Sequence, residues 1–168
     1  MINRGFRAVF VSGFVLVGLV FSVAFAGDDE KASGSDRAIR ITSERMESVD
    51  QKGTVLFTGD VVAVKGKMTI RTDRLEVFYE KGADGKKKLM QIIASGNVVI
   101  REGDRTGTAE TAVYDKPGEI ITLSGNARVQ EGENRIQGEK IILYINEDRS
   151  VVESGSHGKV EAIVYSGE

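Results

Sequence analysis

The sequence contains no cysteine, so disulfide bonds, thiol chemistry and cysteine-based metal sites are excluded. Its one histidine, His157, lies in a glycine-rich stretch, where a solvated turn explains it better than a catalytic base does. No Gly-x-Ser-x-Gly elbow, phosphate-binding loop or histidine cluster with metal-ligand spacing is present. The sequence therefore predicts neither an enzyme nor a bound cofactor or metal.

Proline and helical patterns are also scarce. Pro117 is the single proline, and beyond the N-terminal segment no amphipathic helical period extends past a turn or two. The formal net charge is −2, and it becomes more negative if Arg4 and Arg7 leave with a signal peptide. Nucleic acid is not an expected partner, because its binding depends on clustered positive charge. The basic cluster Lys86 to Lys88 follows Gly82-Ala83-Asp84-Gly85 and is interpreted as a solvated loop tip.

The N-terminus has the pattern of a secretory signal peptide over residues 1–26. Arg4 and Arg7 precede an uncharged apolar run that ends in Ala24-Phe25-Ala26. The alternative is an uncleaved anchor, because the run approaches the roughly 20 residues that cross a bilayer. Residues 27–36 are polar and predict a flexible leader. One domain is expected over residues 37–165, followed by a short C-terminal end at 166–168.

What the sequence does contain is a repeat. The phrases Thr58-Gly59-Asp60-Val61, Ser95-Gly96-Asn97-Val98 and Ser124-Gly125-Asn126-Ala127 each lie within an apolar/polar alternation. Such alternation is typical of β-strands, and repetition predicts strands stacked into one long structure. A glycine that interrupts the strand without breaking the alternation indicates a bend or bulge. Other glycines, such as Gly66, Gly103 and Gly132, are expected to form the turns.

A second motif follows each glycine phrase. The segments 70–78, 106–114 and 136–144 align with one another, and 41–49 fits as a partial first copy. Because successive side chains of a strand point to opposite faces, one parity predicts an apolar interior face. Its predicted members are Ile41, Phe57, Val61, Ala63, Ile70, Leu75, Val77, Ile92, Ala94, Val98, Ile100, Val113, Ile121, Leu123, Ala127, Val129, Ile136, Ile141 and Leu143. The opposite face is expected to carry Lys65, Arg101, Arg128 and Gln130.

Periodicity alone leaves two interpretations of this interior face. It forms either an ordinary sandwich core or the lining of an apolar channel that small residues such as Ala63, Ala94 and Ala127 keep open. The terminal strands are a second candidate site, because an unpaired strand edge can accept a strand from another chain. The edge residues are Ile39, Arg40 and Ile41 at one end and Lys159, Val160, Ala162 and Val164 at the other. Frayed termini are the alternative interpretation of these segments.

The ordered set of phrases resembles the OstA/LptA family. The resemblance rests on the opening Ile39 to Met46, on Phe57 to Val61, on Ile70 to Leu75, and on Leu123 to Ala127 followed by Ile136 to Ile141. Each phrase alone is degenerate, but their order and spacing together are fairly specific. The sequence departs from the family pattern in the Gly82 to Lys88 insertion.

This resemblance implies an all-β fold: a twisted, half-open β-jelly roll of antiparallel strands that is open at both ends. It also implies a periplasmic protein that binds lipopolysaccharide, holds the lipid A acyl chains on its interior face, and stacks end to end with inner-membrane and outer-membrane components, with possible self-association. Two alternatives stay open: a membrane-anchored inner-membrane member of the same pathway, and a closed β-solenoid that mediates protein contacts only.

Overall fold

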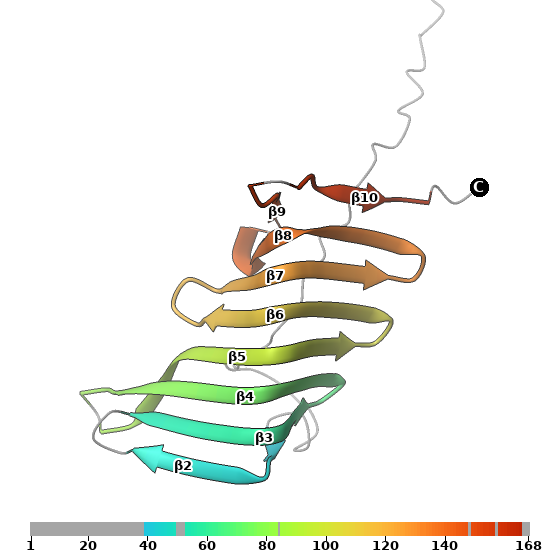
Figure 1. Ribbon diagram of the computed structural model, residues 1–168. Helices are drawn as coiled ribbons and strands as arrows, with labels where there is room; N and C mark the ends of the chain where they lie inside the picture. The colour runs from blue at the N-terminus through green and yellow to red at the C-terminus, as the bar shows by residue number, and fades with distance from the viewer. Residues whose placement is uncertain (1–38, 50–52, 84, 148, 157, 166–168) are drawn as a thin grey trace, which may run out of the picture.

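The computed structural model describes residues 39–49, 53–83, 85–147, 149–156 and 158–165, and most of them lie in one antiparallel sheet (Figure 1). Its ten strands are β1 (Arg40–Thr42), β2 (Arg45–Val49), β3 (Thr54–Lys65), β4 (Met68–Lys81), β5 (Lys87–Glu102), β6 (Arg105–Asp115), β7 (Ile120–Glu131), β8 (Asn134–Tyr144), β9 (Arg149–Glu153) and β10 (Glu161–Ile163). A 3-10 turn, η2 (Ile145–Glu147), follows β8. The predicted signal peptide, the leader, His157 and residues 166–168 lie outside the described residues.

The sheet is a meander that does not close. Strands β3 to β8 pair with their sequence neighbours, β1 and β2 share one edge of β3, and β9 and β10 share one edge of β8. Short turns join the long strands on one side of the sheet, with Gly66, Gly103 and Gly132 at positive φ. The predicted all-β class and glycine-based turns are confirmed.

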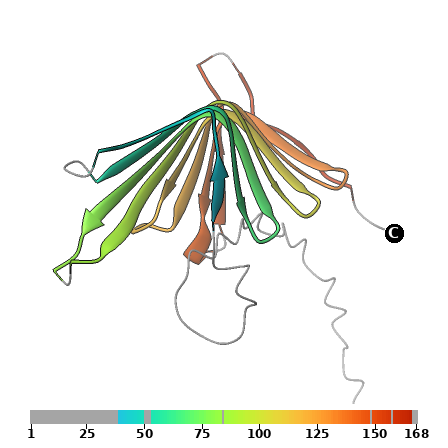
Figure 2. The same cartoon turned by 90° about the horizontal axis from the view of Figure 1, so that it is seen from below.

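Each long strand bends sharply near its middle. The register shifts between Thr58 and Val61, between Ser95 and Val98, and between Ser124 and Ala127. Gly59, Gly96 and Gly125 lie at these shifts with φ of 80°, 82° and 79°, a conformation that glycine adopts readily. Two successive residues there face one on the partner strand, which makes a β-bulge. Figure 2 shows the result: the strands diverge from a common bend into two arms.

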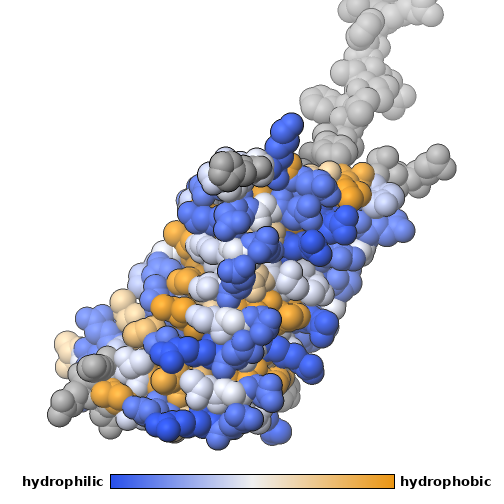
Figure 3. Space-filling model, in the orientation of Figure 1, coloured by the Kyte–Doolittle hydropathy of each residue, from blue (hydrophilic) through white to orange (hydrophobic). Residues whose placement is uncertain are grey.

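The two arms are named here by their strand segments. Arm A holds 45–49, 54–58, 75–81, 87–95, 111–115, 120–124, 140–144 and 149–153; arm B holds 40–42, 61–65, 68–72, 98–102, 105–109, 127–131, 134–138 and 161–163. The face enclosed by the arms is the inner face, and its side chains form the hydrophobic core. Hydrophilic side chains predominate on the outside of the bend, which Figure 3 shows. The bend thus allows one sheet to cover its own apolar face.

Two sequence-based assignments were wrong. Val113 pairs with Ile93 and Thr122, whereas its neighbours Ala112 and Tyr114 are the buried residues, so Val113 lies on the outer face. Lys65 was expected on the outer face but pairs with the buried Met68, and cross-strand partners point to the same side of a sheet. Lys65 therefore lies on the inner face, as its odd-numbered parity with Val61 and Ala63 requires.

Val113 was assigned to the wrong face because the repeat in β6 was aligned one residue too early with the repeat in β4. In β4 the inner-face parity changes across Asp73 and Arg74, and in β6 it changes across Glu110 and Thr111. The structure therefore aligns β4 residues 70–78 with residues 107–115, not with 106–114. The alignments of 136–144 and 41–49 with 70–78 were correct, since Glu139 and Glu44 occupy the position that Asp73 has in β4.

Candidate functional site

The inner face carries two continuous rows of side chains that run across the strands from one end of the sheet to the other. On arm A, directly paired residues form the row Met46, Phe57, Leu75, Ala94, Ala112, Leu123, Ile141 and Val152. On arm B, the row is Ile41, Ala63, Ile70, Ile100, Gly107, Val129, Ile136 and Ala162. Neither row contains a charged residue. The two rows face each other as apolar stripes along the whole length of the sheet.

Most of the predicted interior residues lie in these rows or beside them. The buried ones are Val61, Ala63, Leu75, Val77, Ala94, Val98, Ile100, Ile121, Leu123, Ala127, Val129, Ile141 and Leu143. Ile41, Phe57, Ile70 and Ile92 are partly buried and pack against that core, and Ile136 is partly buried opposite Val129. Of the predicted set, Val113 alone is on the other face.

Several inner-face residues were missed by the sequence analysis. They are Met46, Met68, Thr72, Tyr79, Leu89, Ala109, Ala112, Tyr114, Ile145 and Val152. Tyr114 was missed because the frame of β6 was displaced by one residue. Met68, Tyr79 and Leu89 lie outside the segments that the glycine phrases mark. Continued alternation from Ile70 could have located Met68, and continued alternation from Val77 could have located Tyr79. Alternation from Ile92 does not reach Leu89.

Burial along the inner face is uneven. Leu123 and Ala127, on either side of the bend in β7, are fully buried, so beside the bend the two arms pack against each other. At the N-terminal end, Met46 is 61% exposed although it belongs to the same row. Phe57, Ile41 and Ile70 beside it are only partly buried. The inner face is thus a packed core beside the bend, and it is exposed to solvent at Met46 at its N-terminal end.

The rims of the two arms, away from the bend, are polar. On arm A, the Tyr114 hydroxyl donates a hydrogen bond of 2.8 Å to Glu119, and Lys116 pairs with the same carboxylate. On arm B, Arg105 forms an ion pair of 2.8 Å with Glu131. Burial, followed by the hydrogen bond to Glu119 and by the charge of that carboxylate, raises the pKa of Tyr114 well above its ordinary value. The apolar stripes are therefore bordered by charged groups.

The predicted edge residues lie on short, exposed strands. Arg40 and Ile41 are in β1, with Ile39 just before it, and Ala162 is in β10, with Lys159, Val160 and Val164 flanking that strand. Ile39, Val160 and Val164 are exposed hydrophobic residues, as is Tyr165. Each end of the described sheet thus presents strands whose outer edge has no partner within the chain's described residues. Such an edge is a template for strand addition.

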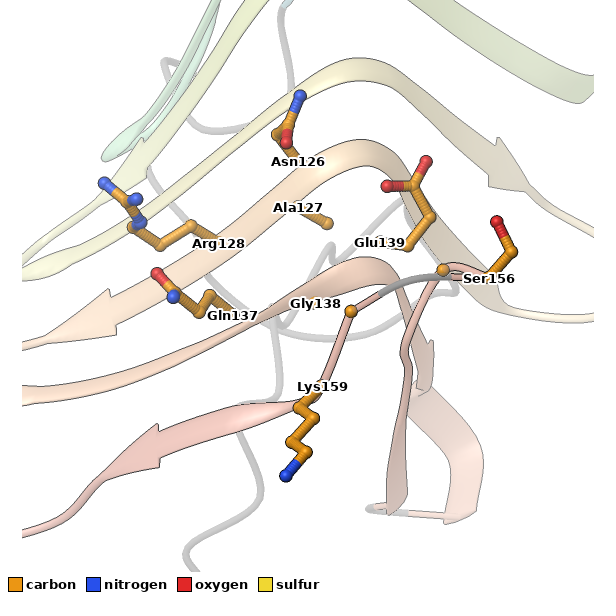
Figure 4. Close-up of a pocket in the computed structure, with 10 residues that line it drawn as sticks. Asn126, Ala127, Arg128, Gln137, Gly138, Glu139, Ser156 and Lys159 are labelled. Carbon is orange, nitrogen blue, oxygen red and sulfur yellow. The ribbon is translucent and has the colours of Figure 1, made fainter.

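A cavity of about 630 Å³ lies beside the bend at the C-terminal end of the sheet (Figure 4). It is lined by β7, by β8 and by the segment that links β9 to β10. Asn126, Arg128, Gln137, Glu139 and Lys159 are among its lining residues, which are mostly polar. In the figure, the Asn126 and Glu139 side chains lie on one side of the strands and Lys159 on the other. Its polar lining distinguishes this cavity from the apolar inner face, so it is not the candidate site.

The described residues include no group of three or more His, Cys, Asp or Glu side chains that could hold a metal ion. Within that same part of the chain, no helix has the length and apolar character needed to cross a membrane.

A single bent antiparallel sheet with an apolar inner face and an unpaired edge at each end defines an open β-jelly roll. The family model described as "LptA/(LptD N-terminal domain) LPS transport protein" matches residues 40–149. The chain therefore belongs to this family of lipopolysaccharide transport proteins. The resemblance to the OstA/LptA family is confirmed.

Curated relatives agree with this assignment. The lipopolysaccharide export system protein LptA of Escherichia coli K12 is 26% identical over 144 residues, which are 80% of this chain and 74% of that protein. The corresponding protein of Haemophilus influenzae is 22% identical over 154 residues, 89% of this chain and 87% of that protein. An uncharacterised protein of Rhizobium meliloti, R00383, is 29% identical over 109 residues, and the match spans only 59% of that protein's length.

A solved structure has the same fold. The crystal structure of LptH from Pseudomonas aeruginosa, described as the LptA-homologous periplasmic component of the lipopolysaccharide transport device, matches with a TM-score of 0.66. The match covers 79% of this chain and 99% of that one at 17% sequence identity. The predicted β-jelly roll is confirmed.

Proposed function

We propose that this chain is a non-enzymatic periplasmic protein that binds lipopolysaccharide by its lipid A acyl chains and bridges inner-membrane and outer-membrane components of the transport machinery. The observation that carries the proposal is the pair of uncharged rows that run along the inner face from β2 to β9 and from β1 to β10. Such rows offer an acyl chain an apolar surface along the whole sheet. The family membership supports the same substrate.

The physics of transport explains why an apolar surface is needed. Burial of one methylene group is worth about 0.8 kcal/mol, so exposing a chain of about 14 carbons to water costs on the order of 10 kcal/mol. A lipid with several such chains does not cross an aqueous space unaided at a useful rate. A protein that covers the chains while the sugars stay in water removes most of this barrier.

The packing of the two arms determines where an acyl chain can enter the inner face. Because Leu123 and Ala127 are fully buried beside the bend of β7, an acyl chain reaches that part of the inner face only if the arms separate there. The partly exposed Met46, Phe57 and Ile70 at the N-terminal end are the first contacts that we propose. Contacts with further residues follow as the arms part along the sheet.

The unpaired edges provide the bridging part of the proposal. Strand addition to β1 and β2 at one end, and to β9 and β10 at the other, would continue the sheet and its two apolar rows into neighbouring proteins. Residues Ile39, Arg40 and Ile41 serve one junction, and Lys159, Val160, Ala162 and Val164 the other. The order of partners along the bridge follows from the family and not from these residues.

Native mass spectrometry of the protein purified from its own periplasm tests the lipid part. We expect a mature chain without residues 1–26 and a bound mass that matches lipopolysaccharide or lipid A. A chain that retains residues 1–26 would support the anchored alternative instead. Recovery of a cleaved chain that stays lipid-free, even after incubation with excess lipopolysaccharide, would contradict lipid binding and favour a role in protein contacts only.

Proline substitution tests the edge part. Amide directions alternate along a strand, so of two adjacent residues in β1 one directs its N–H toward β3 and the other toward the free edge. We therefore compare Ile41→Pro with Thr42→Pro. The variant that loses only the outward amide should keep its thermal stability and its bound lipid but lose assembly, measured by light scattering and by capture of the partner domain. Equal loss of lipid and assembly in that variant would contradict separate roles.

A further inference from the structure

The outer face of arm B carries a row of arginines, here called the arginine stripe. The strand register places them on that face, because each alternates with residues of the inner face: Arg40, Arg71, Arg101, Arg128 and Arg135. They belong to β1, β4, β5, β7 and β8, so the stripe extends along most of the sheet. At the described outer-face positions of arm B the one acidic residue is Glu161, on the last strand. In a chain with a net charge of −2, this face is a local concentration of positive charge.

Most arginines of the stripe have no acidic partner. Arg135 lies 3.9 Å from Glu161, and its Nε atom is buried without a hydrogen-bond partner. Among the described residues, no other ion pair joins the arginine stripe to a carboxylate. On the outer face of arm A, by contrast, four cations have carboxylate partners at 2.8–3.3 Å: Arg45 with Glu47, Arg74 with Glu76, Lys140 with Glu153 and Arg149 with Glu147. Arm B therefore offers guanidinium groups to an anion from outside the chain.

The side chains between these arginines suit an anion that contains sugars. Guanidinium groups bind carboxylates and phosphates through two parallel hydrogen bonds, and the cations of this stripe are all arginines. Threonine hydroxyls and glutamine amides are their cross-strand neighbours, and both can exchange hydrogen bonds with sugar hydroxyls. These neighbours are Thr69 and Thr106 beside Arg101, Thr108 and Gln137 beside Arg128, and Gln130 beside Arg135. The face thus combines recognition of charge with recognition of hydroxyl groups.

The arginine stripe lies close to the opening between the ends of the two arms. Arm B ends in two-residue turns at 66–67, 103–104 and 132–133, so only a thin rim separates its two faces. Arg101 is adjacent in sequence to the rim residue Glu102. On the other side, the hairpin between β4 and β5 makes arm A project farther from the bend, as Figure 2 shows. A headgroup held at the opening therefore meets arm B as the lower of the two walls.

We propose that the arginine stripe binds the anionic sugars attached to a lipid A whose acyl chains lie on the inner face. The inference rests on the proposed function and adds to it a second contact, on the outer face, for the carboxylate and phosphate groups of those sugars. A lipid bound in this way straddles the rim of arm B, with its chains on one face and its sugars on the other. Because the arginines recur along the sheet, the contact stays available as the lipid moves from strand to strand.

A membrane surface is the other anionic partner that suits clustered arginines. The stripe, however, runs across the strands, in the same direction as the two apolar rows. Under the proposed function that direction leads from one membrane toward the other, so the stripe does not lie flat against either. The sugars of the transported lipid are therefore the favoured occupant.

The test compares two lipids that carry the same acyl chains: lipid A alone, and lipopolysaccharide in which lipid A bears its acidic and phosphorylated core sugars. Binding of each is measured by displacement of a fluorescent acyl probe in the same detergent, at low and at high salt. The test variant combines Arg71→Gln, Arg101→Gln and Arg128→Gln, which are exposed residues of the arginine stripe.

A matched control removes the same charge from the outer face of arm A. It combines Arg45→Gln, Arg74→Gln and Arg149→Gln, whose side chains are exposed but paired with carboxylates. Circular dichroism verifies that both variants fold.

We expect the unmodified protein to bind lipopolysaccharide about tenfold or more tightly than lipid A at low salt. The test variant should lose most of this difference and keep its affinity for lipid A, whereas the control variant should behave like the unmodified protein. The difference should shrink at high salt, because exposed charges are screened.

Three results would overturn the inference while leaving the proposed function intact. These are equal affinity of the unmodified protein for the two lipids, equal losses in the test and control variants, and a test variant that keeps its preference for lipopolysaccharide but no longer binds vesicles of phosphatidylglycerol. The last result would make the arginine stripe a membrane contact. Failure of the unmodified protein to bind either lipid would instead contradict the proposed function, on which the inference rests.

Discussion

At the residue scale, each bend places an acidic side chain against a glycine. A Cβ atom on Gly96 would lie 2.4 Å from Asp73 Oδ2, and one on Gly125 would lie 2.7 Å from the Glu110 side chain. The residue after each glycine is an asparagine that donates to that acid: Asn97 to Asp73 at 2.9 Å and Asn126 to Glu110 at 3.0 Å. The amide and the carboxylate thereby tie neighbouring strands together at the bulge.

The first copy departs from this arrangement and yields a prediction. Glu44 lies against Gly59, but the next residue is Asp60, which brings a second carboxylate and no donor. Asp60 has φ of 42°, a conformation that asparagine tolerates well. Asp60→Asn should therefore raise the free energy of unfolding by about 0.5–1.5 kcal/mol, the usual net value of one hydrogen bond. Urea unfolding measures the change, and the reciprocal Asn97→Asp should lower stability. A destabilised Asp60→Asn variant would show that the acid has another role.

Tyr114 provides a pH prediction. Its pKa is raised in the folded state by burial first and then by Glu119, so the unfolded chain loses this proton at lower pH than the folded one does. The contribution of Tyr114 is complete below pH 10, near the ordinary tyrosine pKa, and is lost as the pH rises above it. Stability measured from pH 9 to pH 11 should therefore fall less steeply for Tyr114→Phe than for the unmodified protein. Tyr165→Phe, at an exposed ring, is the control. Parallel curves for Tyr114→Phe and the unmodified protein would contradict the account.

At the element scale, β4 and β5 continue as long strands because the sheet tolerates the bulge near their middle. Thr72 is the one polar residue among the buried side chains of the described core, and its hydroxyl lies 2.9–3.1 Å from the carbonyl oxygens of Arg74, Ser95 and Gly96. Those carbonyls border the bulge between β4 and β5, where the regular ladder is interrupted. The hydroxyl has one proton, so it donates to one of these carbonyl oxygens at a time and satisfies a backbone acceptor beside the bulge.

Two glycine substitutions distinguish the stability cost of a side chain at the bend from its cost in an ordinary turn. Gly96→Ala and Gly103→Ala both place a Cβ at positive φ, but only at Gly96 does that atom meet a neighbour, the Asp73 side chain. Gly103→Ala should cost about 1 kcal/mol of stability, and Gly96→Ala about 1–2 kcal/mol more, because it also displaces Asp73 from Asn97. Urea unfolding of both variants gives the difference. Equal losses would mean that the contact at the bend contributes nothing.

Sequence patterns were sufficient where apolar residues alternate strongly and insufficient where they do not. The glycine phrases located the bends of β3, β5 and β7, and the parity of Val98 and Ile100 or Leu123 and Val129 located the inner face. In β6 three of the inner positions, Gly107, Ala109 and Ala112, are small, Tyr114 is the large one, and Val113 points outward. The weak apolar alternation of this strand therefore allowed an alignment that was displaced by one residue. The acid at Glu110, equivalent to Asp73 and Glu139, was the better marker of the frame.

At the scale of the whole molecule, a single sheet encloses its own core by folding across a line of bulges. Alternation predicted which side chains share a face, but it contains no information on how closely the two arms approach. That distance depends on side-chain packing across the bend, where Leu123 and Ala127 are fully buried, and on the open N-terminal end, where Met46 is not. The inner face is consequently both a core and a candidate binding surface, in different parts of its length.

The most direct measurement of the central claim is photo-crosslinking to lipopolysaccharide from adjacent positions on opposite faces. Phe57 and Ile92 lie on the inner face, whereas Leu56, which pairs with Glu47 and Glu76, and Ile93, which pairs with Val113, lie on the outer face. A photoreactive amino acid at Phe57 or Ile92 should capture lipid through its acyl chains, and the same residue at Leu56 or Ile93 should not. Equal capture from the two faces, or capture from Leu56 and Ile93 alone, would contradict the account.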